Sequence, residues 1–305
     1  MLIGITGASG FIGTPLVASL RQQGHDVVRF VRGRADAADE RGWDPASRRL
    51  DPQAVADLDA VIHLAGAGVA DKRWTPARKK LILDSRVDGT TAVATALAEA
   101  YGAAGQGAVT QGPRVLLSAS GINWYGDTGD RVTDESGPSG QGFLAEVCRQ
   151  WEASTAPAEA AGIRVAHLRT GIVLSSSGGA LGKQLPIFKL GAGAPLGSGR
   201  QWNSWISLRD QIAAITHLLT ADVTGPVNLV APAPVTNRAF TKALGKALHR
   251  PTLPVPVPGF ALTAALGEFA AEGVLIGQRL LPQVLQRSGF SFADGDLAGA
   301  LRSSI

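Results

Sequence analysis

The chain has 305 residues and a formal net charge of +4, a length that suits one large α/β domain or a Rossmann domain with a smaller lobe. Its 45% hydrophobic and 18% charged residues exclude a disordered protein, and its scattered basic residues and lack of long apolar runs predict neither a nucleic-acid nor a membrane partner. The single cysteine, Cys148, excludes an intramolecular disulfide and a zinc site built on cysteines, and we expect a cytoplasmic location.

In the first half of the chain, short runs rich in β-branched residues alternate with longer helical patterns. This alternation is typical of βαβ units and of a parallel sheet. The predicted strands are Leu2 to Thr6, His25 to Val31, Asp59 to Leu64, Arg114 to Ser118 and Arg164 to Thr170, and the predicted helices are Phe11 to Gln23, Pro76 to Tyr101 and Phe143 to Ala161. We therefore predict an α/β fold with a Rossmann-type, doubly wound parallel sheet.

After Thr170, glycine and proline become frequent and strand patterns become rare. Two further segments, Gln211 to Leu219 and Val227 to Val230, resemble one more helix and strand of the main sheet. We predict a Rossmann domain of residues 1–174 plus 206–231 and a smaller C-terminal substrate lobe of residues 175–205 plus 232–305. The lobe is expected over the carboxyl edge of the sheet, where doubly wound folds bind ligands.

A glycine-rich turn follows the first predicted strand and opens the first predicted helix. Gly7, Gly10 and Gly13 are spaced so that the chain turns tightly, approaches a pyrophosphate closely and packs helix against strand. Backbone N–H groups at the start of a helix also attract phosphate. We predict that the whole turn binds a dinucleotide, through Gly7, Ser9, Gly10, Phe11, Ile12 and Gly13.

The end of the second predicted strand indicates which dinucleotide this is. Sites that prefer NAD usually have an acidic residue there, which binds the ribose 2′-hydroxyl. This chain has Arg32 instead, and Asp26 comes too early because it opens the strand. A guanidinium can bind a 2′-phosphate through two N–H groups, so the expected cofactor is NADP(H).

Several motifs spread along the chain resemble those of the extended short-chain dehydrogenases/reductases, and specifically their atypical, nucleoside-diphosphate-sugar epimerase-like subgroup. Besides the glycine turn they are His63-Leu64-Ala65-Gly66, Asp84 to Thr90, Ser118-Ala119-Ser120 leading to Tyr125-Gly126, Leu168-Arg169-Thr170-Gly171, Gly197 to Trp202, Trp205-Ile206 and Pro232 to Thr236. The resemblance covers essentially the whole chain.

The resemblance implies further residues of the cofactor site. Leu64, Ala65 and Gly66 would lie beside the adenosine ribose and the pyrophosphate, and Val173 would pack near the nicotinamide. Arg86 stands where the superfamily commonly has an asparagine, so a cation would reach the cofactor there. Ser118 ends a strand beside the same site. His63, within its strand, is expected to be a packed core residue.

The usual catalytic pair of the superfamily, Tyr-x-x-x-Lys on one helix, is missing. Two alignments of the predicted helix put either Leu144 and Cys148 or Phe143 and Val147 in its positions. Ser120 and Tyr125 remain as catalytic candidates, although Ser118 and Ser120 are equally suited to a structural role, and a tyrosine without a partner is a poor base.

Other residues are weaker candidates for chemistry. Glu146 is a possible proton carrier on the facing helix, and Lys183 and Arg200 are possible anchors for an anionic substrate group. The five histidines have no metal-ligand spacing, so no metal site is predicted.

Two functions remain open. The first is an NADP-dependent oxidoreductase or epimerase-like enzyme that acts on an unidentified small molecule. The second is a noncatalytic NADPH-binding sensor or scaffold. The missing tyrosine and lysine favour the sensor, whereas the complete substrate lobe favours the enzyme.

Overall fold

The computed structural model describes residues 1–104 and 114–305 and is built on a seven-stranded sheet in which every strand pair is parallel. The strand order is β11-β7-β5-β4-β1-β2-β3. The strands are β1 (Leu2–Thr6), β2 (Asp26–Arg32), β3 (Glu40–Trp43), β4 (Ala60–His63), β5 (Val115–Gly121), β7 (Arg164–Thr170) and β11 (Gly225–Leu229). The predicted Rossmann-type α/β fold is confirmed.

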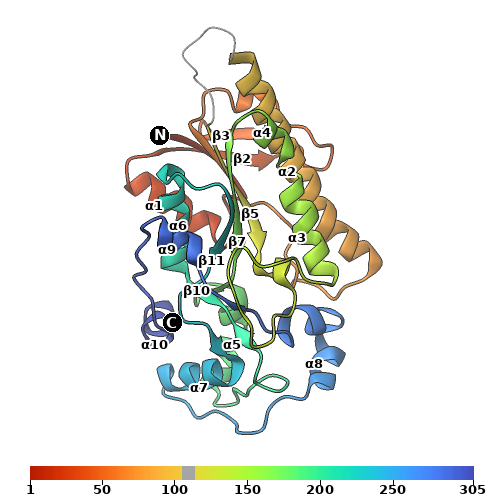
Figure 1. Cartoon of the computed structure of the whole chain (residues 1–305), viewed down its shortest axis with the longest axis vertical. Coiled ribbons are helices and arrows are strands. Elements are labelled where there is room, and N and C mark those ends of the chain that lie inside the picture. Colours follow the sequence, from red (N-terminus) through yellow and green to blue (C-terminus); the bar gives the residue numbers. More distant parts are fainter. Residues whose placement is uncertain (105–113) are drawn as a thin grey trace.

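Helices cover both faces of the sheet, which explains why its central strands are almost wholly apolar (Figure 1). One face carries α1 (Gly13–Gln22), α6 (Leu208–Thr220) and α9 (Gln283–Arg287); the other carries α2 (Pro76–Ala104), α3 (Phe143–Ala153) and α4 (Ala156–Ala160). Each layer has its own buried cluster, with Leu16 and Ile215 on the first face and Val93 and Leu97 on the second.

Most predicted elements are shifted by a few residues at their ends, and two elements differ from the sequence prediction in kind. The edge strand β3 was not predicted, because Glu-Arg-Gly-Trp contains no β-branched residue. It is a strand because it pairs in parallel with β2. The helix predicted over residues 143–161 is two helices, α3 and α4. Pro157 stands in the first turn of α4, where its ring and missing N–H prevent one continuous helix from passing through.

A smaller body lies below the carboxyl ends of the strands in Figure 1. Its elements are β8 (Ile172–Leu174), α5 (Gly179–Lys189), β9 (Trp202–Asn203), β10 (Trp205–Ser207), β12 (Val235–Thr236), α7 (Asn237–Ala247), α8 (Gly259–Leu266), η3 (Ala270–Val274) and α10 (Leu297–Ser304). Leu185, Trp205, Phe240 and Leu301 share its core. Residues 283–292, within the predicted lobe, pack against the main sheet instead. The two-domain division itself stays a prediction.

The C-terminal segment also runs beside a loop of the sheet domain. β13 (Arg279–Leu280) pairs with β6 (Val132–Thr133), and the Thr128 N–H donates to the Gly277 carbonyl at 2.9 Å. Arg73 donates to the carbonyl of Ala264, and Lys79 forms an ion pair with Glu268. In the described part of the chain, no helix has both the length and the apolar character needed to cross a membrane.

His63 is completely buried at the carboxyl end of β4, as expected for a core residue. Its Nδ1 and the Thr6 Oγ1 are 2.7 Å apart, and its ring packs edge-on against Trp43. Its Nε2 has no hydrogen-bond partner among the described residues. Burial, together with the nearby cation Arg86, lowers the pKa of His63 to about 4. The imidazole is therefore neutral in the folded protein at neutral pH.

This burial predicts a pH-dependent stability. Between pH 6.5 and about 4, His63 binds a proton in the unfolded chain but not in the folded one, so the free energy of unfolding should fall as the pH falls through this window, by on the order of 3 kcal/mol. Urea unfolding over a pH series would measure it. His63→Gln should flatten the dependence in part, because His167, whose pKa burial also lowers, contributes in the same direction. The exposed His249→Gln is the control; an unchanged slope in His63→Gln would contradict the prediction.

Candidate active site

The glycine turn at the end of β1 has the geometry that its spacing predicts. Gly7 has φ of +68°, and a Cβ there would lie 2.9 Å from the backbone of Leu64 and Ala65. At Gly13 a Cβ would come 2.1 Å from the Gly7 carbonyl oxygen, so helix and turn touch directly. Gly10 is different: it is exposed, and a Cβ would meet only the Gly7 carbonyl oxygen, at 3.1 Å. The outer side of the turn at Gly10 is therefore open to a ligand.

Arg32 ends β2, beside this turn, and its side chain is exposed. It makes no ion pair or hydrogen bond through its guanidinium within residues 1–104 and 114–305. Asp39, on the segment between β2 and β3, is bound by Arg29 at 2.8 Å and also by Arg21, and the hydrogen bond from Arg29 holds the pKa of Asp39 well below its ordinary value. Asp26 lies at the opposite end of β2. Among the described residues, Arg32 therefore keeps an unpaired guanidinium beside the turn.

The segment after β4 lies against the turn. The N–H groups of Leu64 and Ala65 donate to Thr6 Oγ1 at 3.1 and 3.3 Å, and Gly66 is exposed. Arg86, from α2, donates to the carbonyls of Ala67 and Ile82 and stacks on Trp151 at 4.7 Å. Burial lowers the pKa of Arg86 to about 10, which still leaves it cationic at neutral pH.

The other side of the turn faces the smaller body. The Phe11 ring lies against Gly178 and Gly179 at the start of α5: a Cβ at Gly178 would come 2.8 Å from the ring. The carbonyl of Val173, a buried residue of β8, lies beside Gly179. Phe11 and Val173 therefore lie on the same side of the turn, beside the start of α5, while Ser9 and Ile12 are on the turn itself.

The two catalytic candidates take part in a buried polar network. Arg169 binds both carboxylate oxygens of Glu152 at 2.8 Å, and Ser120 Oγ donates to Glu152 Oε1 at 2.7 Å. Arg169 also donates to the Tyr125 hydroxyl at 2.9 Å, and that hydroxyl donates to Asn228 Oδ1 at 2.7 Å. Burial raises the pKa of Tyr125 to about 12. Both hydroxyls are occupied by partners within the protein.

Ser118 lies beside His63 in the sheet, and its hydroxyl is buried without a hydrogen-bond partner among the described residues. Cys148 is also buried, and burial raises the pKa of its thiol to about 11, so it remains a protonated thiol at neutral pH. Both side chains are buried, so neither is exposed as an acid or a nucleophile.

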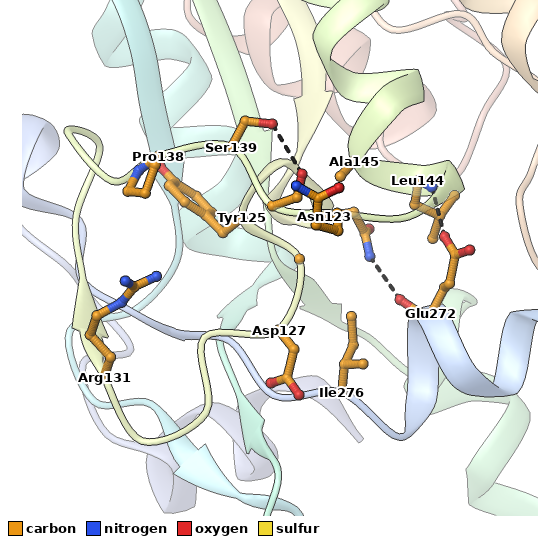
Figure 2. A pocket seen from close by; sticks show the side chains of 13 residues that line it. Asn123, Tyr125, Asp127, Arg131, Pro138, Ser139, Leu144, Ala145, Glu272 and Ile276 are labelled. Atoms are coloured by element: carbon orange, nitrogen blue, oxygen red, sulfur yellow. Dashed lines mark hydrogen bonds between the residues drawn. The ribbon is translucent and has the colours of Figure 1, made fainter.

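A pocket of about 300 Å³ opens next to this network, between the loop after β5, the start of α3 and the C-terminal segment (Figure 2). Asn123 and Tyr125 of η2 (Ile122–Tyr125) line it, together with Leu144 and Ala145 of α3. Glu272 reaches in from η3 and accepts a hydrogen bond from the Leu144 N–H at 2.8 Å. Leu144 is one of the residues that alignment put in place of the superfamily tyrosine.

The pocket joins few of the predicted residues. Of the catalytic candidates, Tyr125 lines it and Ser120 does not. Glu146, Lys183 and Arg200 are not among its lining residues: Glu146 pairs with Arg149 on the surface of α3, and Lys183 donates to the Ala70 carbonyl. Across the residues that the structure describes, no group of three or more histidine, cysteine or acidic side chains is placed to hold a metal ion.

Sequence reasoning missed several residues of the site. Arg169 lies in one of the motifs named above and Glu152 lies in the helix predicted over residues 143–161, but neither residue was assigned a role from the sequence. Asn123, Arg131 and Glu272 carried no local signal, because distant segments bring them to the pocket.

Comparison with known proteins identifies two regions. Residues 3–230 match the NAD dependent epimerase/dehydratase family, and residues 257–304 match a domain of unknown function, DUF1731. An epimerase family protein of Mycobacterium bovis is 45% identical over 301 residues, which cover 98% of this chain and 96% of that protein. The epimerase family protein YfhF of Bacillus subtilis is 34% identical over 312 residues, covering 100% and 98%.

Solved structures agree with these matches. A crystal structure of human epimerase family protein SDR39U1 with NADPH superposes with a TM-score of 0.87 at 30% identity, covering 100% of this chain and 99% of that one. A nucleoside-diphosphate sugar epimerase from Corynebacterium glutamicum, of which 58% is covered by this whole chain, has a TM-score of 0.79 at 33% identity. The resemblance inferred from the sequence motifs is confirmed: the chain belongs to the NAD dependent epimerase/dehydratase family, as an atypical, epimerase-like short-chain dehydrogenase/reductase.

Proposed function

We propose that the chain binds NADP(H) across the carboxyl edge of the sheet, with the diphosphate over the glycine turn and the 2′-phosphate at Arg32. Two features together carry the proposal. The turn is open to a ligand at Gly10, and the exposed guanidinium of Arg32 has no partner within the described chain. The residues present fit the cofactor, since a side chain at Gly10 would fill the space that the phosphates need. The NADPH in the crystal structure of human SDR39U1 supports the choice of dinucleotide.

We further propose that the chain is an oxidoreductase or epimerase-like enzyme and that its small substrate occupies the pocket beside Leu144. When bound, the nicotinamide supplies or accepts a hydride. Leu144 and Ala145 would shield the reacting carbon from water. The Asn123 Nδ2 donates to the Glu272 carbonyl at 3.3 Å, so this residue would orient the substrate through the remaining capacity of its side-chain amide. We also propose a cytoplasmic location, on the strength of the single, buried Cys148.

One observation favours a noncatalytic NADPH sensor instead. Leu144 has no ionisable group, Cys148 is a buried thiol, and the hydroxyls of Ser120 and Tyr125 are engaged in the protein. A screen of NADPH oxidation over carbonyl compounds and nucleotide sugars separates the two functions. Turnover of any of these substrates supports the enzyme, whereas tight cofactor binding without turnover supports the sensor.

Arg32→Ala should reduce the preference for NADPH over NADH. A charge-assisted fork to the 2′-phosphate contributes about 1.5–3 kcal/mol, which corresponds to roughly tenfold to hundredfold in affinity. Calorimetric titration of both cofactors would measure the affinities. The affinity for NADPH should decrease and the affinity for NADH should not change. Arg302→Ala, in α10, is the control and should leave both affinities unchanged. Equal affinity of the unchanged protein for NADPH and NADH would contradict the role of Arg32.

Gly10→Val should weaken NADPH binding at least about tenfold, or 1.4 kcal/mol, while the protein stays folded. The new side chain would occupy the phosphate position, yet within the protein its Cβ meets only one carbonyl oxygen at 3.1 Å. Thermal unfolding of the variant tests whether it stays folded, and a cofactor titration of the same sample tests whether NADPH binding is weakened. Ala18→Val, on the exposed side of α1, is the control. Undiminished affinity in folded Gly10→Val would place the phosphates elsewhere.

Tyr125→Phe should act on stability and not on proton transfer. Removing the hydroxyl leaves Asn228 Oδ1 and one N–H of Arg169 without a partner inside the protein, which costs about 1–3 kcal/mol. Tyr101→Phe is a matched control, because the Tyr101 hydroxyl makes no hydrogen bond within the described residues; it should change the free energy of unfolding by less than about 0.5 kcal/mol. Denaturant unfolding would compare them. If a substrate is found, a hundredfold loss of turnover by folded Tyr125→Phe would instead make this tyrosine the acid.

A further inference from the structure

The pocket beside Leu144 has a charge distribution that the cofactor proposal does not explain. Three of its lining residues carry full charges: Asp127, Arg131 and Glu272. Which of these charges is available to a ligand depends on the partners that each side chain already has.

Both carboxylates are engaged by backbone N–H groups. Asp127 Oδ1 accepts from Gly129 at 3.0 Å and from Gly277 at 3.2 Å. Glu272 Oε2 accepts from Leu144 at the start of α3, where the helix dipole also favours a negative charge. These bonds hold the loop and the C-terminal segment together, so the two carboxylates have a structural role.

Arg131 differs from both. Its side chain is exposed and has no ion pair or hydrogen bond to any residue that the structure describes, although its backbone N–H donates to Thr128. The loop that carries it is held by the pairing of β6 with β13. The pocket therefore presents a guanidinium on a positioned backbone and no competing anion that already binds it.

The arrangement separates charge from apolar surface. Figure 2 shows Arg131 on one side of the pocket and Leu144 and Ala145 on the other. A volume of about 300 Å³ is at the small end of ligand pockets, which typically range from about 300 to 1,000 Å³. A single cation balances one negative charge. The second charge of a dianion would be repelled by the carboxylates of Asp127 and Glu272.

We propose that the pocket takes a small organic monocarboxylate, with the carboxylate on Arg131 and the reacting carbon against Leu144. Arg131 is then the residue that selects the substrate class. The inference rests on the proposed function, because it places the substrate of that enzyme.

The test uses two matched probes, levulinate and levulinamide, which share a ketone and differ in whether the far end is charged. Calorimetry and ligand-observed NMR would measure their affinity for the full chain, with and without saturating NADPH. We expect levulinate to bind at millimolar concentration and more tightly than levulinamide. Arg131→Gln should weaken levulinate about tenfold to hundredfold and leave levulinamide unchanged, as expected for loss of a charge-assisted hydrogen-bonded pair.

Arg250→Gln is the matched control, since Arg250 is exposed but does not line the pocket; this variant should bind levulinate normally. The inference is overturned if levulinate does not bind at millimolar concentration, if the two probes bind equally, or if Arg131→Gln, shown to be folded by its melting temperature, retains the affinity for levulinate. If the protein prefers levulinate through Arg131 but does not bind NADPH, only the cofactor proposal is refuted. NADPH binding without that preference would refute only the role of Arg131.

Discussion

The guanidinium of Arg169 and the carboxylate of Glu152 lie face to face inside the protein, with side-chain exposures of only 3% and 8%. Removing two charges from water is costly, and the pair is tolerated only because nearly every donor and acceptor around it is used. Ser120 supplies one donor, Tyr125 accepts one N–H, and Trp124 stacks on the guanidinium at 3.9 Å. A change to any one of these groups leaves a buried charge incompletely paired.

This pair connects parts of the chain that are far apart in sequence. Arg169 belongs to β7 and Glu152 to α3, and through Tyr125 the network reaches Asn228 of β11. The Asn228 N–H in turn donates to the carboxylate of Glu135, which also accepts from Val284 in α9. The network thus determines where the loop after β5 leaves the sheet, and with it the wall of the pocket. The absence of a free tyrosine hydroxyl from that wall follows from the same bonds.

The sequence predicted the parts that depend on local pattern. β1 and β7 have the predicted ends, because their strand patterns stop at a glycine turn and at Thr170-Gly171. The position of Arg32 was predictable for the same reason, because the strand pattern of β2 ends at this residue. The edge strand β3 was not, since Glu-Arg-Gly-Trp becomes a strand only by pairing with β2. The pocket was least predictable, because the contact between Thr128 and Gly277 spans 149 residues.

The hydrogen bond from Leu144 to Glu272 has a consequence for how members of such a family diverge. The cofactor turn lies within residues 3–230, which match the epimerase/dehydratase family, whereas Glu272 and Ile276 lie within residues 257–304, which match a separate family model. One wall of the pocket therefore lies in a different matched region from the glycine turn. Substitutions in the C-terminal module can reshape the pocket while the dinucleotide turn remains intact, so new ligand preferences can arise without rebuilding the Rossmann domain.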